Sequence, residues 1–212
     1  MGIKIALAGN PNCGKTTMFN ALTGANQYVG NWPGVTVEKK EGKLKGKRKN
    51  DNIVVTDLPG IYSLSPYTLE EVVSRDYILN DNPDVIIDLV DATNIERNLY
   101  LTTQLIETGV PVVIALNMTD LLEKRGIKID TKRLSMLLDC PIFETSALKQ
   151  TGLDALVETA IKVANKKEVD LPREIFSKEI EAAVADVKGV LPDTISEDKK
   201  RWYAVKFLEN DS

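Results

Sequence analysis

The stretch Gly9-Asn10-Pro11-Asn12-Cys13-Gly14-Lys15-Thr16 decides the fold, because it follows an apolar segment and opens a segment with helical spacing. It matches the pattern G-x-x-x-x-G-K-[ST], whose glycines let backbone amides converge on a phosphate group. In such a loop Lys15 would reach the β- and γ-phosphates of a nucleotide, and the Thr16 hydroxyl would bind Mg²⁺. An ordinary glycine-rich turn, the alternative, would leave both residues unexplained. We predict nucleotide contacts from Gly9, Asn10, Pro11, Asn12, Cys13, Gly14, Lys15, Thr16 and Thr17.

Apolar segments that are typical of buried strands recur along the chain, at residues 3–8, 53–56, 85–90, 112–116 and 141–143, and residues 35–44 suit a further extended strand. Segments with helical spacing alternate with them, at residues 15–23, 69–79, 99–108, 131–138 and 153–164. This alternation predicts an α/β fold of the P-loop NTPase class, with a six-stranded, mostly parallel sheet and helices on both faces. Segment 35–44 is the exception, because we expect it to pair antiparallel with segment 53–56 through the loop 45–52.

Composition narrows the function classes. The 212 residues are 43% apolar and 27% charged, as in ordinary soluble domains, and the net charge of −4 argues against binding nucleic acid. The chain has no histidine, which excludes Ser/His/Asp hydrolases, Cys/His proteases and His-ligated metal sites. Its two cysteines, Cys13 and Cys140, suit a reducing compartment, and Cys13 is expected to be a small loop residue. No apolar run approaches the length of about 20 residues that a transmembrane helix needs.

A change of composition near residue 168 predicts a domain boundary. Residues 166–173 form a charged segment that ends in a proline and an arginine. Beyond it, apolar residues recur at helical spacing from Phe176 to Leu191, and a second helix is expected around Trp202, which we expect to be a core anchor. Two short helices cannot close a core by themselves. We therefore expect a domain at 1–167 and part of a helical domain at 168–212.

Two further motifs follow later strands. Asp57-Leu58-Pro59-Gly60 ends the third strand, where Asp57 could hold Mg²⁺ through a water and the Gly60 amide could contact a γ-phosphate. In isolation this motif is equally typical of a plain Pro-Gly turn. Asn117-Met118-Thr119-Asp120 ends the fifth strand, where the Asp120 carboxylate could accept hydrogen bonds from guanine N1 and its 2-amino group. Ser146-Ala147-Leu148 follows the sixth strand and could offer an amide to the guanine O6. Together they predict a guanine nucleotide site, with Leu58, Pro59, Met118 and Thr119 among its contacts.

These motifs resemble the translation-factor-related class of P-loop GTPases and, more narrowly, the N-terminal domain of the ferrous iron transport protein B (FeoB) family. The resemblance covers essentially the whole chain and is most specific at residues 9–41, 57–77 and 91–101. Met118 replaces the lysine that most small GTPases have in N-K-x-D, but a methionine there is itself similar to the FeoB pattern. Its apolar packing against the base and the phosphate loop could replace the lysine stem, at some loss of nucleotide affinity.

The resemblance implies a first switch in Gly34-Val35-Thr36, where Thr36 would contact Mg²⁺ and the γ-phosphate. The segment before it, residues 26–33, is rich in Gly, Asn and Pro and is expected to be a mobile loop. The resemblance also implies a K⁺ site made by the Asn12 side chain and by the carbonyl groups of Gly30 and Trp32.

Catalysis is expected to differ from that of many GTPases. Where those enzymes carry a glutamine that orients the attacking water, directly after D-x-x-G, this chain has Ile61, which cannot hydrogen-bond. In GTPases that resemble FeoB, K⁺ can take the place of an arginine finger and offset charge in the transition state. The residues expected to take part in hydrolysis are Asn12, Lys15, Thr36 and Gly60.

The resemblance also implies a cytoplasmic position at the bacterial inner membrane, with the transmembrane region of the same parent protein and small cytoplasmic Feo-type proteins as partners. Homo-oligomerisation stays open. Residues 39–49 carry seven basic side chains and one acid, which fits a solvated hairpin or a contact with anionic headgroups. The rival functions are a switch without meaningful turnover and a soluble ribosome-associated GTPase. A kinase is disfavoured, because no acceptor-binding segment accompanies the phosphate loop.

Overall fold

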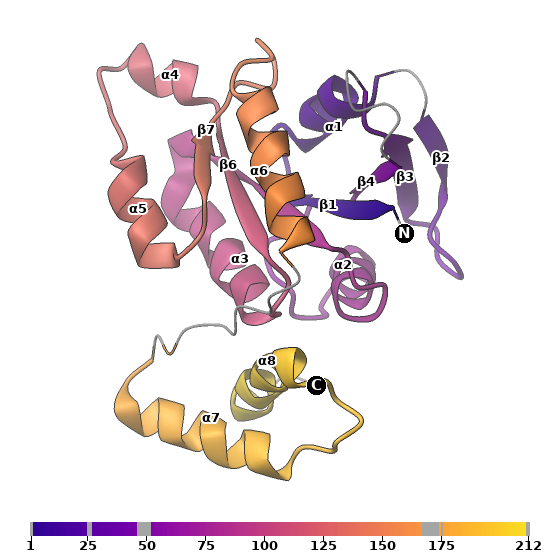
Figure 1. Cartoon of the computed structure of the whole chain (residues 1–212), viewed down its shortest axis with the longest axis vertical. Coiled ribbons are helices and arrows are strands. Elements are labelled where there is room, and N and C mark those ends of the chain that lie inside the picture. The colour runs from indigo at the N-terminus through magenta and orange to yellow at the C-terminus, as the bar shows by residue number, and fades with distance from the viewer. Residues whose placement is uncertain (1, 25–26, 46–51, 167–173, 175, 211–212) are drawn as a thin grey trace.

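A computed structural model describes residues 2–24, 27–45, 52–166, 174 and 176–210 of the chain. Its centre is one seven-stranded sheet with the order β2-β3-β4-β1-β5-β6-β7 (Figure 1). Neighbouring strands are parallel, except that β3 runs antiparallel to both β2 and β4. The strands are β1 (Ile3–Gly9), β2 (Gln27–Asn31), β3 (Glu38–Lys43), β4 (Ile53–Asp57), β5 (Val85–Asp91), β6 (Val112–Asn117) and β7 (Ile142–Glu144). The α/β class and the antiparallel pairing of β3 with β4 are confirmed.

The sheet has seven strands rather than the expected six, because β2 forms where we expected a loop at residues 26–33. β2 pairs only with β3, so it is an edge strand, and neither of its faces lies in the core. Tyr28 and Val29 are exposed on it. Such a strand needs no apolar alternation, which is why the sequence pattern missed it. β3 also begins later than expected, since residues 32–37 form the turn that joins it to β2.

The helices cover both faces of the sheet, as expected (Figure 1). They are α1 (Lys15–Thr23), α2 (Leu69–Asn80), α3 (Ile95–Glu107), α4 (Thr119–Glu123), α5 (Thr131–Leu138), α6 (Leu153–Asn165), α7 (Lys178–Val190) and α8 (Glu197–Leu208), with a short 3₁₀ helix η1 (Ala92–Asn94) before α3. α3 begins four residues earlier than predicted. α4 was not predicted, because five residues are too few to show helical periodicity.

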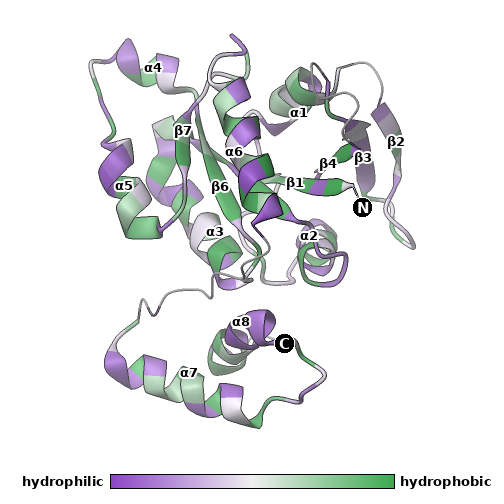
Figure 2. Cartoon of the chain, in the orientation of Figure 1, coloured by the Kyte–Doolittle hydropathy of each residue, from purple (hydrophilic) through white to green (hydrophobic). Residues whose placement is uncertain are grey.

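Alternate residues of the central strands pack into two separate cores. On β1, Ile5 and Leu7 join α1 and α6 on one face, and Ala6 and Ala8 join α2 and α3 on the other. Because both faces are covered, β1, β5 and β6 consist mainly of apolar residues (Figure 2). The parallel strands therefore end together at one buried edge, where the loops that follow β1, β4 and β6 meet.

One carboxyl group is buried in the second core. Asp88 on β5 is 1% exposed, and its Oδ2 accepts a hydrogen bond of 2.5 Å from the Thr102 hydroxyl of α3. Burial raises the pKa of Asp88 to about 7, against a smaller opposing effect of the Thr102 hydrogen bond. This group changes charge near neutral pH.

α7 and α8 pack on each other and lie beyond the end of α3 (Figure 1). Their own apolar core has only Val184, Ala204 and Val205 fully buried, so it cannot hold the pair in place alone. Trp202 is buried, as we expected of a core anchor. The expected boundary at residue 168 lies outside the described residues.

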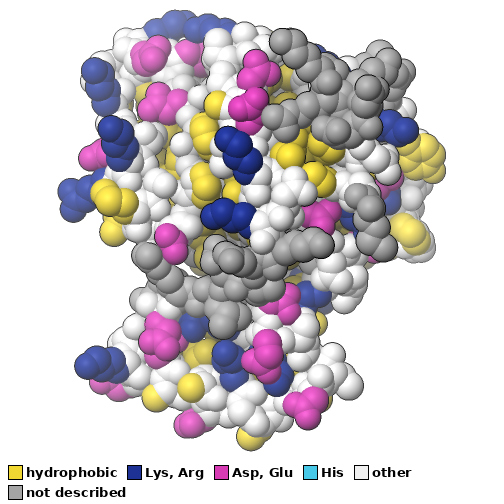
Figure 3. Space-filling view, in the orientation of Figure 1, with side chains coloured by type: hydrophobic (Ala, Val, Ile, Leu, Met, Phe, Trp, Pro, Cys, Tyr) yellow, Lys and Arg dark blue, Asp and Glu magenta, His cyan; other side chains and the backbone are white. Residues whose placement is uncertain are grey.

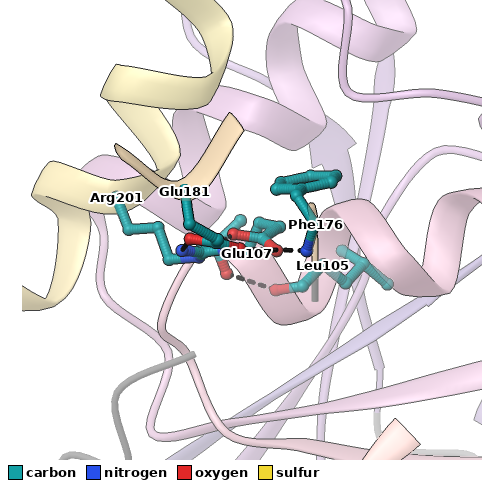
Figure 4. A network of polar contacts seen from close by, with 6 residues as sticks. Leu105, Glu107, Phe176, Glu181 and Arg201 are labelled. Carbon is teal, nitrogen blue, oxygen red and sulfur yellow. Dashed lines mark hydrogen bonds and ion pairs between the residues drawn. The ribbon is translucent and has the colours of Figure 1, made fainter. Parts of the chain in front are cut away.

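A buried ion triad fastens this helical pair to the sheet domain (Figure 4). The Arg201 guanidinium of α8 donates to Glu107, the last residue of α3, with Nε 2.7 Å from Oε2. The same group donates to Glu181 of α7, with Nη1 2.7 Å from Oε2. All three side chains are at most 11% exposed. The two carboxylates raise the pKa of Arg201, so the cation stays charged.

Charged side chains of both signs are interspersed on the face seen in Figure 3, over the sheet domain and the helical pair alike. Of the basic run at residues 39–49, Lys39 and Lys40 lie on β3 and form ion pairs with Glu41 and Glu38. Residues 46–49 lie outside the described residues. No helix among the described residues is long and apolar enough for a membrane crossing.

Candidate functional site

The predicted phosphate loop lies between β1 and α1. β1 ends at Gly9 and α1 begins at Lys15, directly after Gly14 in the left-handed region at φ 94°. A Cβ at Gly14 would come within 2.5 Å of the Asn117 Nδ2, so no larger residue fits. Thr16 and Thr17 are exposed in the first turn of α1, whose N-terminal amides favour an anion. This geometry suits a bound phosphate.

Two charges of opposite sign meet at the base of this loop. The Lys15 ammonium lies 2.9 Å from the Asp57 Oδ1, and the two side chains are 11% and 7% exposed. Their proximity follows from the sheet, because β1 and β4 are parallel neighbours and Leu7 is in register with Asp57. The backbone after Asp57 also stays close, since the Ile61 amide donates to the Gly9 carbonyl at 3.3 Å. The structure thus brings together two motifs that are more than 40 residues apart.

Asn117 joins three loops. Its Nδ2 donates to the Cys13 carbonyl at 2.9 Å, and its Oδ1 accepts from the Ala147 amide at 3.0 Å. Asn117 and Ala147 are 3% and 4% exposed, so both hydrogen bonds are shielded from water. The Thr119 hydroxyl adds a longer bond of 3.4 Å to the Thr145 carbonyl. The three motifs assigned to phosphate and base therefore form one connected structure.

Asp120 lies next to this junction and contacts a residue that sequence reasoning missed. Its Oδ2 lies 3.0 Å from the Lys149 ammonium, and its side chain is 19% exposed. The hydrogen bond from Lys149 lowers the pKa of Asp120, so the carboxylate is ionised at neutral pH. Met118, in the left-handed region at φ 63°, precedes α4 and carries no charge. Leu148, between Ala147 and Lys149, is exposed.

The residues assigned to the first switch lie apart from these contacts. Gly34 and Thr36 are exposed, and Val35 half-buried, in the turn between β2 and β3. Gly30 lies within β2 and pairs with Lys39. The Trp32 indole is 6% exposed and packs edge-on against Tyr77, with ring centroids 5.3 Å apart.

Two predicted contacts have buried side chains. Cys13 is 1% exposed, and burial raises the pKa of its thiol to about 12, which agrees with its expected role as a small loop residue rather than a nucleophile. Asn10 is 3% exposed, and neither its Nδ2 nor its Oδ1 has a hydrogen-bond partner among the described residues. Cys13 and Asn10 therefore offer a ligand their backbone rather than a reactive side chain.

Ile61 points away from the loop. Its side chain is 3% exposed and packs with Leu58 and Leu64 in the core between the sheet and α2 and α3. Position 61 thus contributes no group that could orient water.

The segment that follows Asp-Leu-Pro-Gly is attached to α3. The Gln104 Oε1 accepts from the Leu64 amide at 2.7 Å and from the Ser63 hydroxyl at 3.2 Å. The Arg97 guanidinium lies 4.1 Å from the centre of the Tyr62 ring. We did not single out Gln104 from the sequence, although its position three residues after the buried Leu101 would have placed it near the core.

Two family models match the chain: Ferrous iron transport protein B over residues 3–160, and the FeoB cytosolic helical domain over residues 176–212. A mutant of NFeoB from S. thermophilus bound to mGDP has a TM-score of 0.94 and 52% identity, over 100% of this chain and 80% of that one. NFeoB from S. thermophilus bound to GDP·AlF4⁻ and K⁺ has a TM-score of 0.87 and 52% identity, over 99% and 80%.

Curated relatives are longer than this chain. The Fe(2+) transporter FeoB of Shigella flexneri is 41% identical over 213 residues, which is 99% of this chain and 27% of the relative. The Fe(2+) transporter FeoB of Legionella pneumophila is 50% identical over 165 residues, 76% of this chain and 22% of the relative. The chain thus spans about a quarter of the length of the curated relatives it matches.

Proposed function

The chain belongs to the ferrous iron transport protein B family, and from that membership we propose that it is the part of a ferrous iron transporter that binds and hydrolyses GTP. The observation that carries this proposal is the buried junction at Asn117, which ties the phosphate loop to both predicted base-binding loops. In this assignment the loop from Gly9 to Thr17 holds the phosphates, and Asp120 with the 146–148 loop holds guanine. Asp57 and Gly60 report whether the γ-phosphate is present.

The oxygen donors near the loop fit Mg²⁺, which binds few protein ligands and completes its shell with phosphates and water. The Thr16 hydroxyl is exposed at the start of α1, and the Asp57 carboxylate faces the loop through its contact with Lys15. Thr36 would join them from the first switch. We assign these three residues to Mg²⁺, which neutralises charge on the phosphates when bound.

Hydrolysis is assigned to Asn12, Lys15, Thr36 and Gly60, without a side chain from position 61. Asn12 is exposed, and its backbone takes the left-handed conformation at φ 65°. Its side-chain oxygen and the carbonyls of Gly30 and Trp32 are donors of the kind that suit K⁺, which when bound supplies positive charge beside the phosphates. Among the described residues, the Trp32 carbonyl accepts one long bond, of 3.3 Å from the Val35 amide, and its oxygen has a second lone pair that a cation could use.

GTP turnover measured in equal concentrations of KCl and NaCl tests this assignment. We expect turnover at least about tenfold faster in KCl, the range of a single transition-state donor. Asn12→Ala should remove the K⁺ effect and leave GDP binding largely intact. Asn82→Ala is the matched control, because Asn82 is also left-handed, at φ 47°, and lies outside the loop. Equal turnover in the two salts would refute the K⁺ role, and no turnover with intact GTP binding would favour a switch.

For the parent protein we propose a position at the cytoplasmic side of the bacterial inner membrane, coupled to the transmembrane region of the same polypeptide. Small cytoplasmic Feo-type proteins are the proposed further partners. Within this chain we propose a GTPase domain at residues 1–167 and a helical regulatory region at residues 168–212. Iron uptake by cells that carry the full-length protein with Lys15→Ala tests the coupling, and uptake equal to that of the unaltered protein would contradict it.

A further inference from the structure

Lys149 lies in a loop whose shape directs it toward Asp120. The loop is closed by a pair of backbone hydrogen bonds between Ser146 and Thr151, each 3.2 Å long. Inside it, the Lys149 amide donates to the Ser146 hydroxyl at 3.3 Å, and Gln150 takes a left-handed conformation at φ 55°. The backbone that carries Lys149 is thus folded by its own contacts.

The partner of Lys149 is equally fixed. Asp120 lies in the first turn of α4, and the residue before it, Thr119, bonds to the Thr145 carbonyl at the base of the same loop. Asn117 attaches this turn to Ala147 at 3.0 Å. The hydrogen bonds of Thr119 and Asn117 therefore hold the start of α4 against the 146–151 loop, and the ion pair of 3.0 Å between Lys149 and Asp120 links them a third time.

This contact has a consequence for base recognition, and the reasoning rests on the proposed binding of guanine at Asp120. A guanine base offers two parallel N–H donors, from N1 and from the 2-amino group, and both must meet one carboxylate. The carboxylate of an isolated aspartate has a broad distribution of χ2 angles, so its orientation is not fixed. A cation on one oxygen restricts that rotation, and Met118 has no charge with which to do so.

We propose that Lys149 is a specificity-determining positioning residue, whose ammonium group fixes the Asp120 carboxylate in the orientation that accepts both guanine N–H groups. Lys149 does not have to leave when the base binds. Each carboxylate oxygen accepts more than one hydrogen bond, so Oδ2 can hold the ammonium and one base N–H together.

The test compares GDP with IDP, whose hypoxanthine base lacks the 2-amino group and so offers one N–H in place of two. Lys149→Met keeps the length of the side chain and removes its charge. Because Lys149 is 54% exposed, we expect it to weaken GDP binding by about two- to fivefold and IDP binding by less, so that the preference for GDP falls. Lys149→Arg should restore the preference, since it keeps the cation.

Lys124→Met is the matched control, because Lys124 is an exposed lysine four residues after Asp120 and acts on it through charge alone. It should leave the preference for GDP unchanged. In turnover assays Lys149→Met should raise the KM for GTP and leave kcat unchanged, whereas a general loss of structure would lower kcat too.

Four outcomes separate this inference from the proposed function. GDP affinity that is unchanged or tighter in Lys149→Met would overturn the positioning role, and so would an equal loss for GDP and IDP. Failure of the unaltered chain to bind GDP, or retention of its GDP preference in Asp120→Asn, would instead refute the guanine site itself.

Discussion

Replacing Asp88 with asparagine should stabilise the protein, by an amount that grows with pH. Asp88 is 1% exposed between β5 and α3, and burial raises its pKa from 3.8 to about 7. The folded state therefore binds the proton more tightly than the unfolded state does. Well below pH 3.8 both states are protonated and the group has no effect. Between pH 4 and 7 only the unfolded state ionises, so the free energy of unfolding falls as pH rises.

The size of this effect follows from the difference in pKa. The rise of the pKa from 3.8 to about 7 corresponds to a total loss of about 4 kcal/mol in the free energy of unfolding. This full loss is reached above pH 7. Part of it is already present at pH 5.5, so the change between pH 5.5 and pH 8.5 is about 2 kcal/mol. Asparagine has nearly the same shape but does not ionise. Any constant penalty for its amide group cancels when the same pair of proteins is compared across pH.

Urea unfolding, followed by far-ultraviolet circular dichroism at pH 5.5, 6.5, 7.5 and 8.5, measures this difference. The gain of Asp88→Asn over the unaltered protein should rise by about 2 kcal/mol across the series. Asp186→Asn is the control, because Asp186 is exposed on α7 and its replacement should give a constant difference. A constant difference for Asp88→Asn as well would show that this carboxyl does not titrate between pH 5.5 and 8.5.

Three other predictions concern buried contacts. Gly109→Ala should lower the free energy of unfolding by about 1–3 kcal/mol, because Gly109 has φ 78° and a Cβ there would lie 2.4 Å from the Asp198 carbonyl oxygen. Unchanged stability in urea titrations would contradict this prediction. Arg201→Met removes the cation that Glu107 and Glu181 share, so we expect the free energy of unfolding to fall by about 3–5 kcal/mol and hydrogen exchange to become faster in α8 than in α1. Equal exchange in both helices would count against the triad. Burial raises the pKa of the Cys13 and Cys140 thiols to about 12. At pH 8 both thiols should therefore resist alkylation in the folded protein and react after unfolding in urea. Rapid labelling of the folded protein would contradict this prediction.

The parts of the fold that the sequence predicted are those with both faces buried. β1, β5 and β6 lie between two layers of helices, so nearly every residue in them is apolar and the strands are easy to recognise. β2 has no buried face and α4 has too few residues, and each left no periodic signal. The local pattern records burial that repeats over several residues, so it does not detect an unburied strand or a helix of five residues.

The candidate site also has a part that the sequence predicted and a part that it did not. The phosphate loop and the Asn117 and Ser146 motifs were predictable, because parallel strands deliver their carboxyl ends to one edge of the sheet. The contact of Lys149 with Asp120 depends on how two loops fold, and no spacing rule describes it. The contact of Arg201 with Glu107 was not predicted for a similar reason, since the two residues are 94 positions apart in the sequence.

Because 94 residues separate Glu107 from Arg201, the two residues are also synthesised at different times. Glu107 and the whole sheet leave the ribosome before Arg201 does, because the strands end with β7 at Glu144. α7 and α8 share an apolar core of only three buried side chains, Val184, Ala204 and Val205, so they gain a stable position only on a sheet domain that has already formed. Until Arg201 emerges, Glu107 stays hydrated at the end of α3 and carries no cost of burial. A nascent chain whose residues up to about 165 have left the ribosome is therefore expected to hold a folded nucleotide-binding domain, and the helical pair is added last.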